Sequence, residues 1–267
     1  MTDRYAVIGN PVAHSKSPWI HAEFARATRQ DIEYGRIEAP REGFAAAVGA
    51  FRDAGGRGLN VTLPFKEQAC GLCGETTARA RAAGAVNTLR FDPPGIYGDN
   101  TDGAGLVRDL AANLGLVLAG RRVLLAGAGG AARGVVQPLL EAGVGRLVIA
   151  NRTVARARSL AARFTGTRAC GYEALRGESF DLVVNATSAG LEDAMPPLPR
   201  GVFARGALAY DMVYGRVTPF LRAARAAGAA VSDGLGMLVE QAAESFFLWR
   251  GVRPDTAPVL AQLRRGA

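Results

Sequence analysis

A glycine-rich segment near the middle of the chain has the pattern of a dinucleotide-binding loop. It reads Gly-x-Gly-x-x-Ala over 127–132 and lies between an apolar segment, 123–126, and a predicted helix that ends near residue 142. The first glycine permits a tight turn, the second lets a pyrophosphate approach the backbone, and the helix N-terminus attracts the anion. An ordinary glycine-rich turn is the alternative. The residues predicted to bind a cofactor here are Gly127, Ala128, Gly129, Gly130 and Ala131.

The residues after the next predicted strand, 146–150, indicate which dinucleotide would bind. An NAD site carries an acidic residue about twenty residues beyond the glycines, where it binds the ribose 2′-hydroxyl. This chain instead has Asn151, Arg152 and Thr153, with Arg156 one helical turn further on. Because guanidinium groups pair with phosphate, the segment predicts NADP. In an arginine-rich chain, two solvated arginines are the alternative.

Polar residues also gather where other predicted strands begin or end. Asn60 and Thr62 lie just before Lys66, Asn87 lies at a second strand, and 98–103 reads Gly-Asp-Asn-Thr-Asp-Gly. Open α/β sheets bind ligands at the carboxyl ends of their strands, although turn chemistry alone would explain any one cluster.

Ser17-Pro18 predicts a helix start with Ser17 as its N-cap. Hydroxyl and N–H groups there would suit a carboxylate ligand, and simple capping is the alternative.

Lysine is rare in this chain. Of the 32 cationic side chains, only Lys16 and Lys66 are lysines, and the others are arginines. Arginine does not release its proton, and its planar guanidinium is bulkier than an ammonium. The two lysines are therefore candidates for positions where only an ammonium works.

Composition excludes several classes of protein. The chain has 267 residues, a net charge of +8, 49% hydrophobic and 21% charged residues, which is the balance of a globular protein with one large or two modest domains. The arginines are scattered singly or in pairs, so no nucleic-acid partner is expected. No stretch of about 18 apolar residues and no secretory segment is present, so no membrane partner is expected. Three cysteines suit the reducing cytoplasm, which is the expected location.

Two kinds of site are not expected. His14 and His21 have no third ligand within reach by spacing, so the sequence predicts no metal site. Cys70 and Cys73 match C-x-x-C, but they lack a second pair and a thioredoxin-like context, so we expect no redox role.

Predicted strands and helices alternate along the whole chain, which indicates α/β layers. The first half has predicted strands at 4–8, 32–37, 58–62 and 86–91, helices at 18–28, 41–54 and within 65–82, and a turn over 92–95. The second half has predicted helices at 102–114 and 154–164 and strands at 123–126, 146–150, 181–184 and 207–210. The last apolar helix, 237–249, is expected to pack back on the first half. We therefore expect two domains: an open α/β domain of 1–101 plus 237–267, and a doubly wound Rossmann-type NADP domain over 102–236.

Ten segments, in order along the chain, resemble the shikimate dehydrogenases of aromatic amino-acid biosynthesis. They are 5–11, 15–18, 60–66, 83–88, 98–103, the loop that starts at Gly127, 151–153, 185–188, 210–214 and 233–238. Each segment is a modest match alone, but the full series in family order is specific. The sequence departs from the family pattern at Ala78, where an acidic residue is common.

The resemblance implies an enzyme that reversibly reduces 3-dehydroshikimate to shikimate with a hydride from NADPH. Lys66 and Asp102 would handle the proton, and the first domain would bind the substrate. Ser15 and Ser17 would hold the substrate carboxylate, with Tyr214 nearby. The implied contacts to the ring hydroxyls or the carbonyl region are Asn60, Thr62, Asn87 and Gln241. The implied cofactor contacts are Asn151, Arg152, Thr153 and Arg156 for the phosphate, and Thr187, Met212 and Gly234 for the nicotinamide side.

Two other functions stay open on the sequence alone. A quinate/shikimate dehydrogenase of the same fold would use NAD and NADP less selectively, and Asn151-Arg152 argues against it. A non-enzymatic NADPH sensor would keep the glycine loop but would need neither Lys66 nor Asp102. The only expected partner is the small-molecule substrate, and the expected assembly is a monomer or a homodimer.

Overall fold

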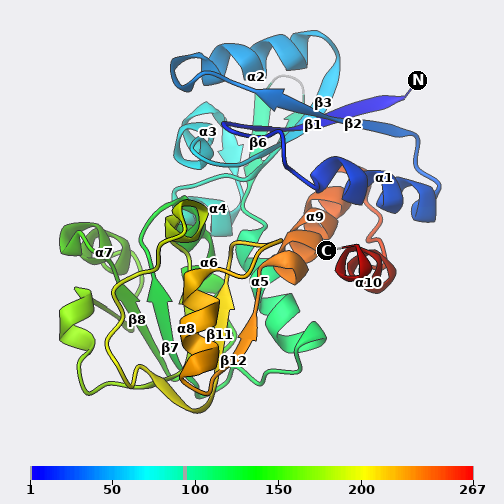
Figure 1. Cartoon of the computed structure of the whole chain (residues 1–267). Helices are drawn as coiled ribbons and strands as arrows, with labels where there is room; N and C mark the ends of the chain where they lie inside the picture. Colours follow the sequence, from blue (N-terminus) through cyan, green and yellow to red (C-terminus); the bar gives the residue numbers. More distant parts are fainter. Residues whose placement is uncertain (1, 93–94, 267) are drawn as a thin grey trace. The chain divides into compact units, whose positions relative to one another are not determined.

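The computed structural model describes residues 2–92 and 95–266 (Figure 1). The chain divides into two compact units, Met1–Leu106 with Leu238–Ala267 (unit 1) and Val107–Met237 (unit 2). Within the described residues, each unit is built on a six-stranded sheet. The predicted turn over 92–95 includes Pro93 and Pro94, which lie outside the described residues. No helix of the described chain is both long and apolar enough to cross a membrane.

Unit 1 has a mixed sheet in the order β2-β1-β3-β5-β6-β4. β1 runs parallel to β2 and β3, whereas β5 is antiparallel to β3 and β6. The strands are β1 (Asp3–Gly9), β2 (Ile32–Glu38), β3 (Gly56–Val61), β4 (Glu75–Thr76), β5 (Thr88–Asp92) and β6 (Gly95–Asp99). The helices are α1 (Ser17–Thr28), α2 (Phe44–Asp53, after the 3₁₀ turn Arg41–Gly43), α3 (Lys66–Leu72), α4 (Ala78–Ala83), the start of α5 (Asp102–Arg108), most of α9 (Leu235–Arg250) and α10 (Ala257–Arg265).

Helices cover both faces of this sheet. Figure 1 shows α2 on one face of β1 and β3, with α1 and α9 on the other. Side chains such as Ile8, Leu59 and Phe65 are fully or almost fully buried in the core on the α2 side. This packing fixes the strand ends from which the polar residues of unit 1 project.

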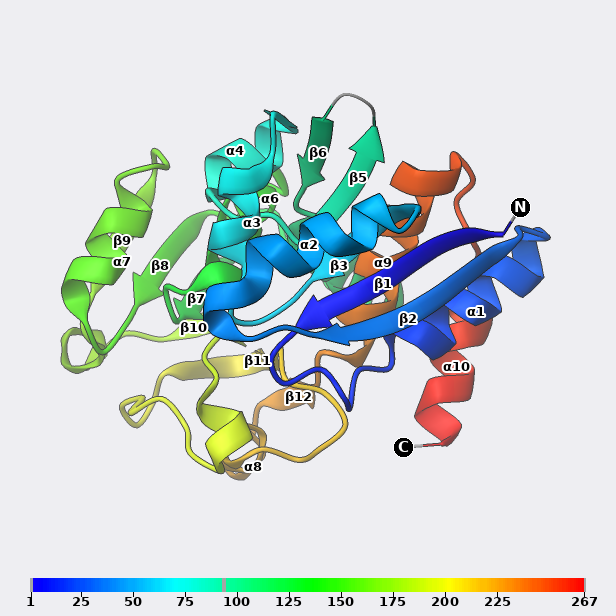
Figure 2. The same ribbon diagram turned by 90° about the horizontal axis from the view of Figure 1, so that it is seen from above.

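Unit 2 has a wholly parallel sheet in the order β12-β11-β10-β7-β8-β9. The strands are β7 (Arg122–Ala126), β8 (Arg146–Ala150), β9 (Thr167–Cys170), β10 (Phe180–Asn185), β11 (Phe203–Asp211) and β12 (Ala230–Ser232). The helices are α6 (Gly130–Glu141), α7 (Val154–Ala161) and α8 (Pro219–Ala226), with a π-helical turn at Asp109–Asn113 and 3₁₀ turns at Tyr172–Leu175 and Ala189–Glu192. Figure 2 shows α7 and α8 on opposite sides of the strands.

The strand order of unit 2 is that of a doubly wound nucleotide-binding sheet. Its central strands are buried on both faces, with Val123–Ala126 and Leu147–Ala150 fully inaccessible, as continuous apolar runs predict. The order reverses between β7 and β10, which is where such sheets bind ligands. The predicted fold class, two α/β domains of which the second is Rossmann-type, is confirmed.

The division of the chain differs slightly from the expected one. Unit 1 continues through Leu106, beyond the predicted limit at 101, and it resumes at Leu238. Asp102 therefore belongs to unit 1, where it is hydrogen-bonded to Lys66 and Asn87. The helix predicted over 102–114 is also interrupted, because α5 ends at Arg108 and passes into the π-helical turn.

We predict that Gly58→Ala destabilises unit 1 by about 1–3 kcal/mol, the usual cost of overpacking. A Cβ on Gly58 would lie 2.5 Å from Leu89 O and 2.6 Å from Trp249 Nε1, the two atoms that form a hydrogen bond between β5 and α9. Gly35→Ala in β2 is the matched control, since its Cβ would meet no atom within 4 Å. Urea unfolding followed by tryptophan fluorescence reports on unit 1, which holds both Trp19 and Trp249. Equal midpoints for the two variants would contradict the prediction.

Candidate active site

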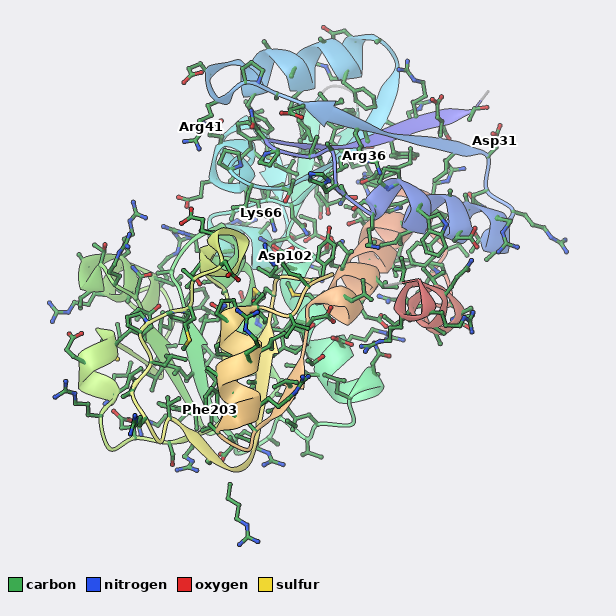
Figure 3. The ribbon with its side chains drawn as sticks, in the orientation of Figure 1. Asp31, Arg36, Arg41, Lys66, Asp102 and Phe203 are labelled. Atoms are coloured by element: carbon green, nitrogen blue, oxygen red, sulfur yellow. The ribbon has the colours of Figure 1, made fainter. Side chains whose placement is uncertain are left out.

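Two charged side chains meet at the sheet edge of unit 1. Lys66 is the first residue of α3, and Asp102 is the first residue of α5. Lys66 Nζ donates to Asp102 Oδ2 at 2.5 Å, and the two side chains are only 14% and 6% exposed. Figure 3 shows both side chains close together below α3. The Lys66 carbonyl accepts from Val86 N at 2.8 Å, which ties the start of α3 to the segment before β5.

Asn87 fixes the orientation of the Asp102 carboxylate. Its Nδ2 donates to Asp102 Oδ1 at 2.9 Å, so both carboxylate oxygens of Asp102 have a partner. Its Oδ1 accepts from Thr101 N at 2.8 Å and from Thr88 Oγ1 at 2.9 Å. With its amide engaged at both ends, Asn87 positions the carboxylate that holds the ammonium of Lys66.

Asn60 belongs to a second, adjoining part of this network. Its Oδ1 accepts from Tyr34 OH at 2.7 Å, and its Nδ2 donates to Ser245 Oγ at 2.9 Å. Gln241 lies one turn before Ser245 on α9, and its Oε1 accepts from Asn87 Nδ2 at 3.3 Å. The structure thus brings together Asn60, Asn87, Gln241, Lys66 and Asp102 from segments far apart in the sequence.

Sequence reasoning did not single out four members of this network. Thr88 and Thr101 lie inside segments that carry the family resemblance, so the motifs already pointed to them. Ser245 is one helical turn after Gln241, and that spacing was its only signal. Tyr34 lies in the edge strand β2, and nothing in the sequence connects it to Asn60.

Ser15 and Ser17 lie at the start of α1. Ser17 is 5% exposed, and its N–H donates to Ser15 Oγ at 3.3 Å. The expectation that Ser17 caps the helix is wrong: Lys16 is the N-cap residue and makes no side-chain capping bond. Arg36 donates to the Ser15 carbonyl at 2.6 Å through Nη2 and so pins the turn. Ser17 is thus the first helical residue rather than its cap.

Thr62 and Tyr214 occupy different parts of the molecule. Thr62 follows β3, and a Cβ on Gly9 would lie 2.3 Å from Thr62 Cγ2, so only glycine allows these two turns to approach. Tyr214 follows β11 and belongs to unit 2. Of the predicted substrate residues, Tyr214 alone lies outside unit 1.

The glycine loop of unit 2 has the backbone geometry that a pyrophosphate site needs. Gly127 has φ +116°, and a Cβ there would lie 3.0 Å from Ala186 O, so the position requires glycine. A Cβ on Gly129 would meet no atom within 4 Å, which leaves its backbone open to a ligand. α6 starts at Gly130 with no side-chain cap and no acidic residue in its first turn. Its N–H groups are therefore available to an anion.

The loop after β8 fits a 2′-phosphate. Arg152, Thr153 and Arg156 are exposed, and Asn151 Nδ2 donates to Thr153 O at 3.0 Å. Within 2–92 and 95–266, neither guanidinium has an ion-pair partner, so both are able to pair with a phosphate. No acidic side chain stands at this strand end to bind a ribose hydroxyl. Together with the open glycine loop, these residues fit NADP.

Thr187, Met212 and Gly234 lie beyond the carboxyl ends of β10, β11 and β12. Asn185 Oδ1 accepts from Thr187 Oγ1 at 2.7 Å, and Gly234 is packed so closely that a Cβ would lie 2.3 Å from Met212 O. The buried Asp211 accepts from Thr218 Oγ1 at 2.6 Å and from Asn185 Nδ2 at 3.2 Å, and its burial raises its pKa. A chain of hydrogen bonds thus holds the loops that carry these residues.

The cysteines and acidic residues of the described chain form no metal centre. No group of three or more His, Cys, Asp or Glu side chains among the described residues could hold a metal ion. Cys70 and Cys73 are free and half-buried, and burial raises the pKa of the Cys73 thiol to about 12. Cys73 is therefore a protonated, unreactive thiol at neutral pH.

Three stretches of the chain match known family models. Residues 7–89 match the shikimate dehydrogenase substrate binding domain, 109–192 match shikimate / quinate 5-dehydrogenase, and 234–264 match the shikimate 5′-dehydrogenase C-terminal domain. The shikimate dehydrogenase (NADP(+)) of Methylobacillus flagellatus is 61% identical over 267 residues, which cover 98% of this chain and 99% of that protein. The chain belongs to the shikimate dehydrogenase family. The resemblance that the ten motifs indicated is confirmed.

Solved structures agree with the fold. An Ael1 enzyme from Pseudomonas putida superposes with a TM-score of 0.92 and 53% identity and covers 98% of both chains. Shikimate 5-dehydrogenase of Thermus thermophilus, solved in complex with NADP(H) and shikimate, gives a TM-score of 0.89 at 40% identity over 100% of both chains. The family architecture therefore extends over the whole of this chain.

We predict that His21 makes unit 1 sensitive to acid. Its ring is fully buried and stacks on Tyr34 at 4.2 Å, and burial lowers its pKa from 6.5 to about 3 while Asn60 opposes the shift. Below pH 6.5 the unfolded chain binds a proton that the folded chain does not bind until about pH 3. The free energy of unfolding therefore decreases as the pH is lowered from 6.5 to about 3. At about 1.4 kcal/mol per pH unit, the wild type should lose about 2 kcal/mol more than His21→Phe between about pH 6.5 and 4.5.

Urea unfolding at these two pH values, followed by tryptophan fluorescence, measures this difference. His14→Ala removes the other histidine, which is exposed, and serves as the control with wild-type behaviour. Parallel pH dependences of wild type and His21→Phe would contradict the assignment.

Proposed function

We propose that this chain is an NADP-dependent oxidoreductase that interconverts 3-dehydroshikimate and shikimate. The observation that carries the proposal is the Lys66 ammonium held 2.5 Å from Asp102 Oδ2 at a polar sheet edge. Family membership supports the substrate, since the curated relatives are named shikimate dehydrogenase (NADP(+)). An NADPH sensor without activity would have no use for this buried pair.

The two units divide the work. Unit 1 binds the substrate and moves the proton, because it carries Lys66, Asp102 and the polar network around Asn87. Unit 2 binds NADP through the loop at Gly127 and the residues after β8. These domain roles are supported by the match of residues 7–89 to a substrate-binding domain.

The substrate is an anion with several hydroxyl groups. Ser15 and Ser17 bind its carboxylate through their hydroxyl groups. Asn60, Thr62, Asn87 and Gln241 contact the ring hydroxyls or the carbonyl region. In this arrangement one end of the substrate is held at the start of α1 and the other at Lys66.

The bound NADPH supplies the hydride that reduces the ketone carbon. Negative charge then develops on the former carbonyl oxygen, which must gain a proton to become a hydroxyl. The Lys66 ammonium stabilises that charge and donates the proton from Nζ. Asp102 holds the ammonium in place and accepts a hydrogen bond from a substrate hydroxyl. In the oxidation of shikimate, Lys66 accepts the proton instead.

The cofactor is NADP rather than NAD. Arg152, Thr153 and Arg156 bind the 2′-phosphate, with Asn151 bracing the loop. The loop Gly127, Ala128, Gly129, Gly130 and Ala131 binds the pyrophosphate at the start of α6. Thr187, Met212 and Gly234 line the nicotinamide. We place the enzyme in the cytoplasm as a monomer or homodimer, a location supported by three unpaired cysteines.

A cross of two substrates with two cofactors tests the function. Purified protein is assayed for absorbance of reduced cofactor with shikimate or quinate and with NADP⁺ or NAD⁺. We expect kcat/KM to be highest for shikimate with NADP⁺. A higher kcat/KM for quinate would make the chain a quinate/shikimate dehydrogenase, and NADP binding without turnover would make it a sensor.

We predict that Arg152→Ala weakens NADP⁺ binding and leaves NAD⁺ binding nearly unchanged. A charge-assisted hydrogen bond of about 1.5–3 kcal/mol corresponds to a loss of roughly 10–150-fold in affinity. Arg158→Ala is the matched control, since Arg158 is exposed on the same helix, α7, and is not assigned to the site. Titration calorimetry with both cofactors measures the effect, and equal weakening of both would show that Arg152 is structural.

We predict that Lys66→Ala lowers kcat by roughly 10²–10⁴-fold, the range for removal of a general acid–base group. The NADP⁺ dissociation constant should stay within about 2-fold of the wild-type value, because the glycine loop lies in the other unit. Steady-state kinetics and calorimetry separate the two effects. A variant that keeps most of its kcat would remove Lys66 from the mechanism.

A further inference from the structure

A second ion pair, with a buried carboxylate and a partly exposed guanidinium, lies at the end of β6, three residues before Asp102. Asp99 is 2% exposed. Its Oδ1 accepts from Arg79 Nε at 2.7 Å, and its Oδ2 accepts from Arg79 Nη2 at 2.5 Å. Oδ1 also accepts from Thr77 Oγ1 at 2.6 Å and from Asn100 N at 2.7 Å. Four hydrogen bonds, two of them in a bidentate guanidinium pair, therefore fix this carboxylate.

Arg79 is itself held in place. It lies on α4, whose N-cap Thr77 accepts from Ala80 N at 3.2 Å. A second carboxylate, Glu244 on α9, lies 3.9 Å from Arg79 Nη2. Burial alone would raise the pKa of Asp99, but the hydrogen bonds and charge of Arg79 outweigh it and hold the pKa below its usual value. The pair is thus charged at neutral pH.

The backbone of Asp99 leads directly to the Lys66–Asp102 pair. Asp99 O accepts from Asn87 N at 3.0 Å, and the Asn87 side chain donates to Asp102 Oδ1 at 2.9 Å. Asn87 Oδ1 in turn accepts from Thr101 N at 2.8 Å. A displacement of Asp99 would therefore shift Asp102, both through the backbone between them and through the hydrogen bonds of Asn87.

We propose that Arg79, through its bidentate bond to Asp99, is a positioning residue that sets the Asp102 carboxylate against Lys66. An ion pair adds little net stability, whether it is exposed or buried in place of apolar side chains. A bidentate guanidinium does, however, fix the direction of a carboxylate as well as its distance. The inference rests on the proposed function, because it assigns Arg79 a part in the reaction of that same site.

Arg79→Lys is the decisive variant. Lysine keeps the charge but cannot bond both oxygens of Asp99 as a fork does. We expect kcat for shikimate oxidation to fall by about 10–100-fold, the effect of a small misplacement at a reacting group. The KM for NADP⁺ and its dissociation constant should both stay within about 2-fold of the wild-type values, because the glycine loop lies in the other unit. Arg57→Lys, at an exposed ion pair with Asp3, is the matched control and should leave kcat unchanged.

A double-mutant comparison shows whether Arg79 acts through Asp102. In an Asp102→Asn background, Arg79→Lys should lower kcat by no more than about 2-fold, since the group it positions is already lost. The same 10–100-fold drop in both backgrounds would overturn the inference and make Arg79 a general structural residue. If the wild type is active and Arg79→Lys has the same kcat as Arg57→Lys, the inference is overturned while the proposed function stands. An inactive wild type would overturn both.

Thr77→Val is the milder variant if Arg79→Lys does not fold, as judged by tryptophan fluorescence and NADP⁺ binding. It removes one of the four hydrogen bonds to Asp99, together with the capping bond from Ala80 N to Thr77, and it keeps Arg79 itself. We expect a smaller fall in kcat, about 3–10-fold, again with unchanged KM for NADP⁺. An unchanged kcat would overturn the inference.

Discussion

The arrangement of unit 1 depends on one interaction, the ion pair of Lys66 with Asp102. A largely buried ammonium is stable only when a carboxylate pairs with it, and that carboxylate must in turn have its remaining oxygen satisfied. Asn87 supplies that second bond. Asp99 holds the backbone next to both residues, because its carbonyl accepts from Asn87 N and its carboxylate accepts from Asn100 N. Three strand ends, of β3, β5 and β6, therefore have to meet at one edge of the sheet. Because β5 is antiparallel to both β3 and β6, its N-terminal end lies beside their C-terminal ends, with Thr88 paired to Asn60 and to Asp99.

Unit 2 meets a different constraint, because it must present backbone rather than side chains. Gly127 turns with a positive φ against Ala186, and Gly129 leaves open space where a side chain would stand. The adjacent arginines Arg152 and Arg156 are exposed rather than buried in ion pairs. These exposed guanidiniums are available to pair with the 2′-phosphate that we propose they bind. Buried bonds such as that of Asp211 to Thr218 keep the neighbouring loops in place.

The sequence predicted the elements that have strong local patterns and missed those defined by tertiary contacts. The buried apolar runs of β7 and β8 were recognisable because both of their faces are covered. β6, with Gly95, Gly98 and Asp99, has turn-like composition and is a strand only because it pairs with β5. α8 carried a readable signal, Thr218 before Pro219, which the pattern analysis did not use. In the site, Lys66 stood out by its rarity, whereas the Tyr34–Asn60 and Asn60–Ser245 bonds join residues 26 and 185 positions apart, which no local pattern encodes.

The central claim is that Lys66 supplies a proton and not only a charge. Lys66→Arg tests it most directly, because arginine keeps the positive charge next to Asp102 but does not release a proton near neutral pH. Arg57→Lys, a lysine–arginine exchange at the exposed ion pair with Asp3, is the control and should retain wild-type kcat. For shikimate oxidation with NADP⁺, we predict that kcat of Lys66→Arg stays roughly 10²–10⁴-fold below that of the wild type. A kcat near the wild-type value would show that charge alone suffices and would contradict the account.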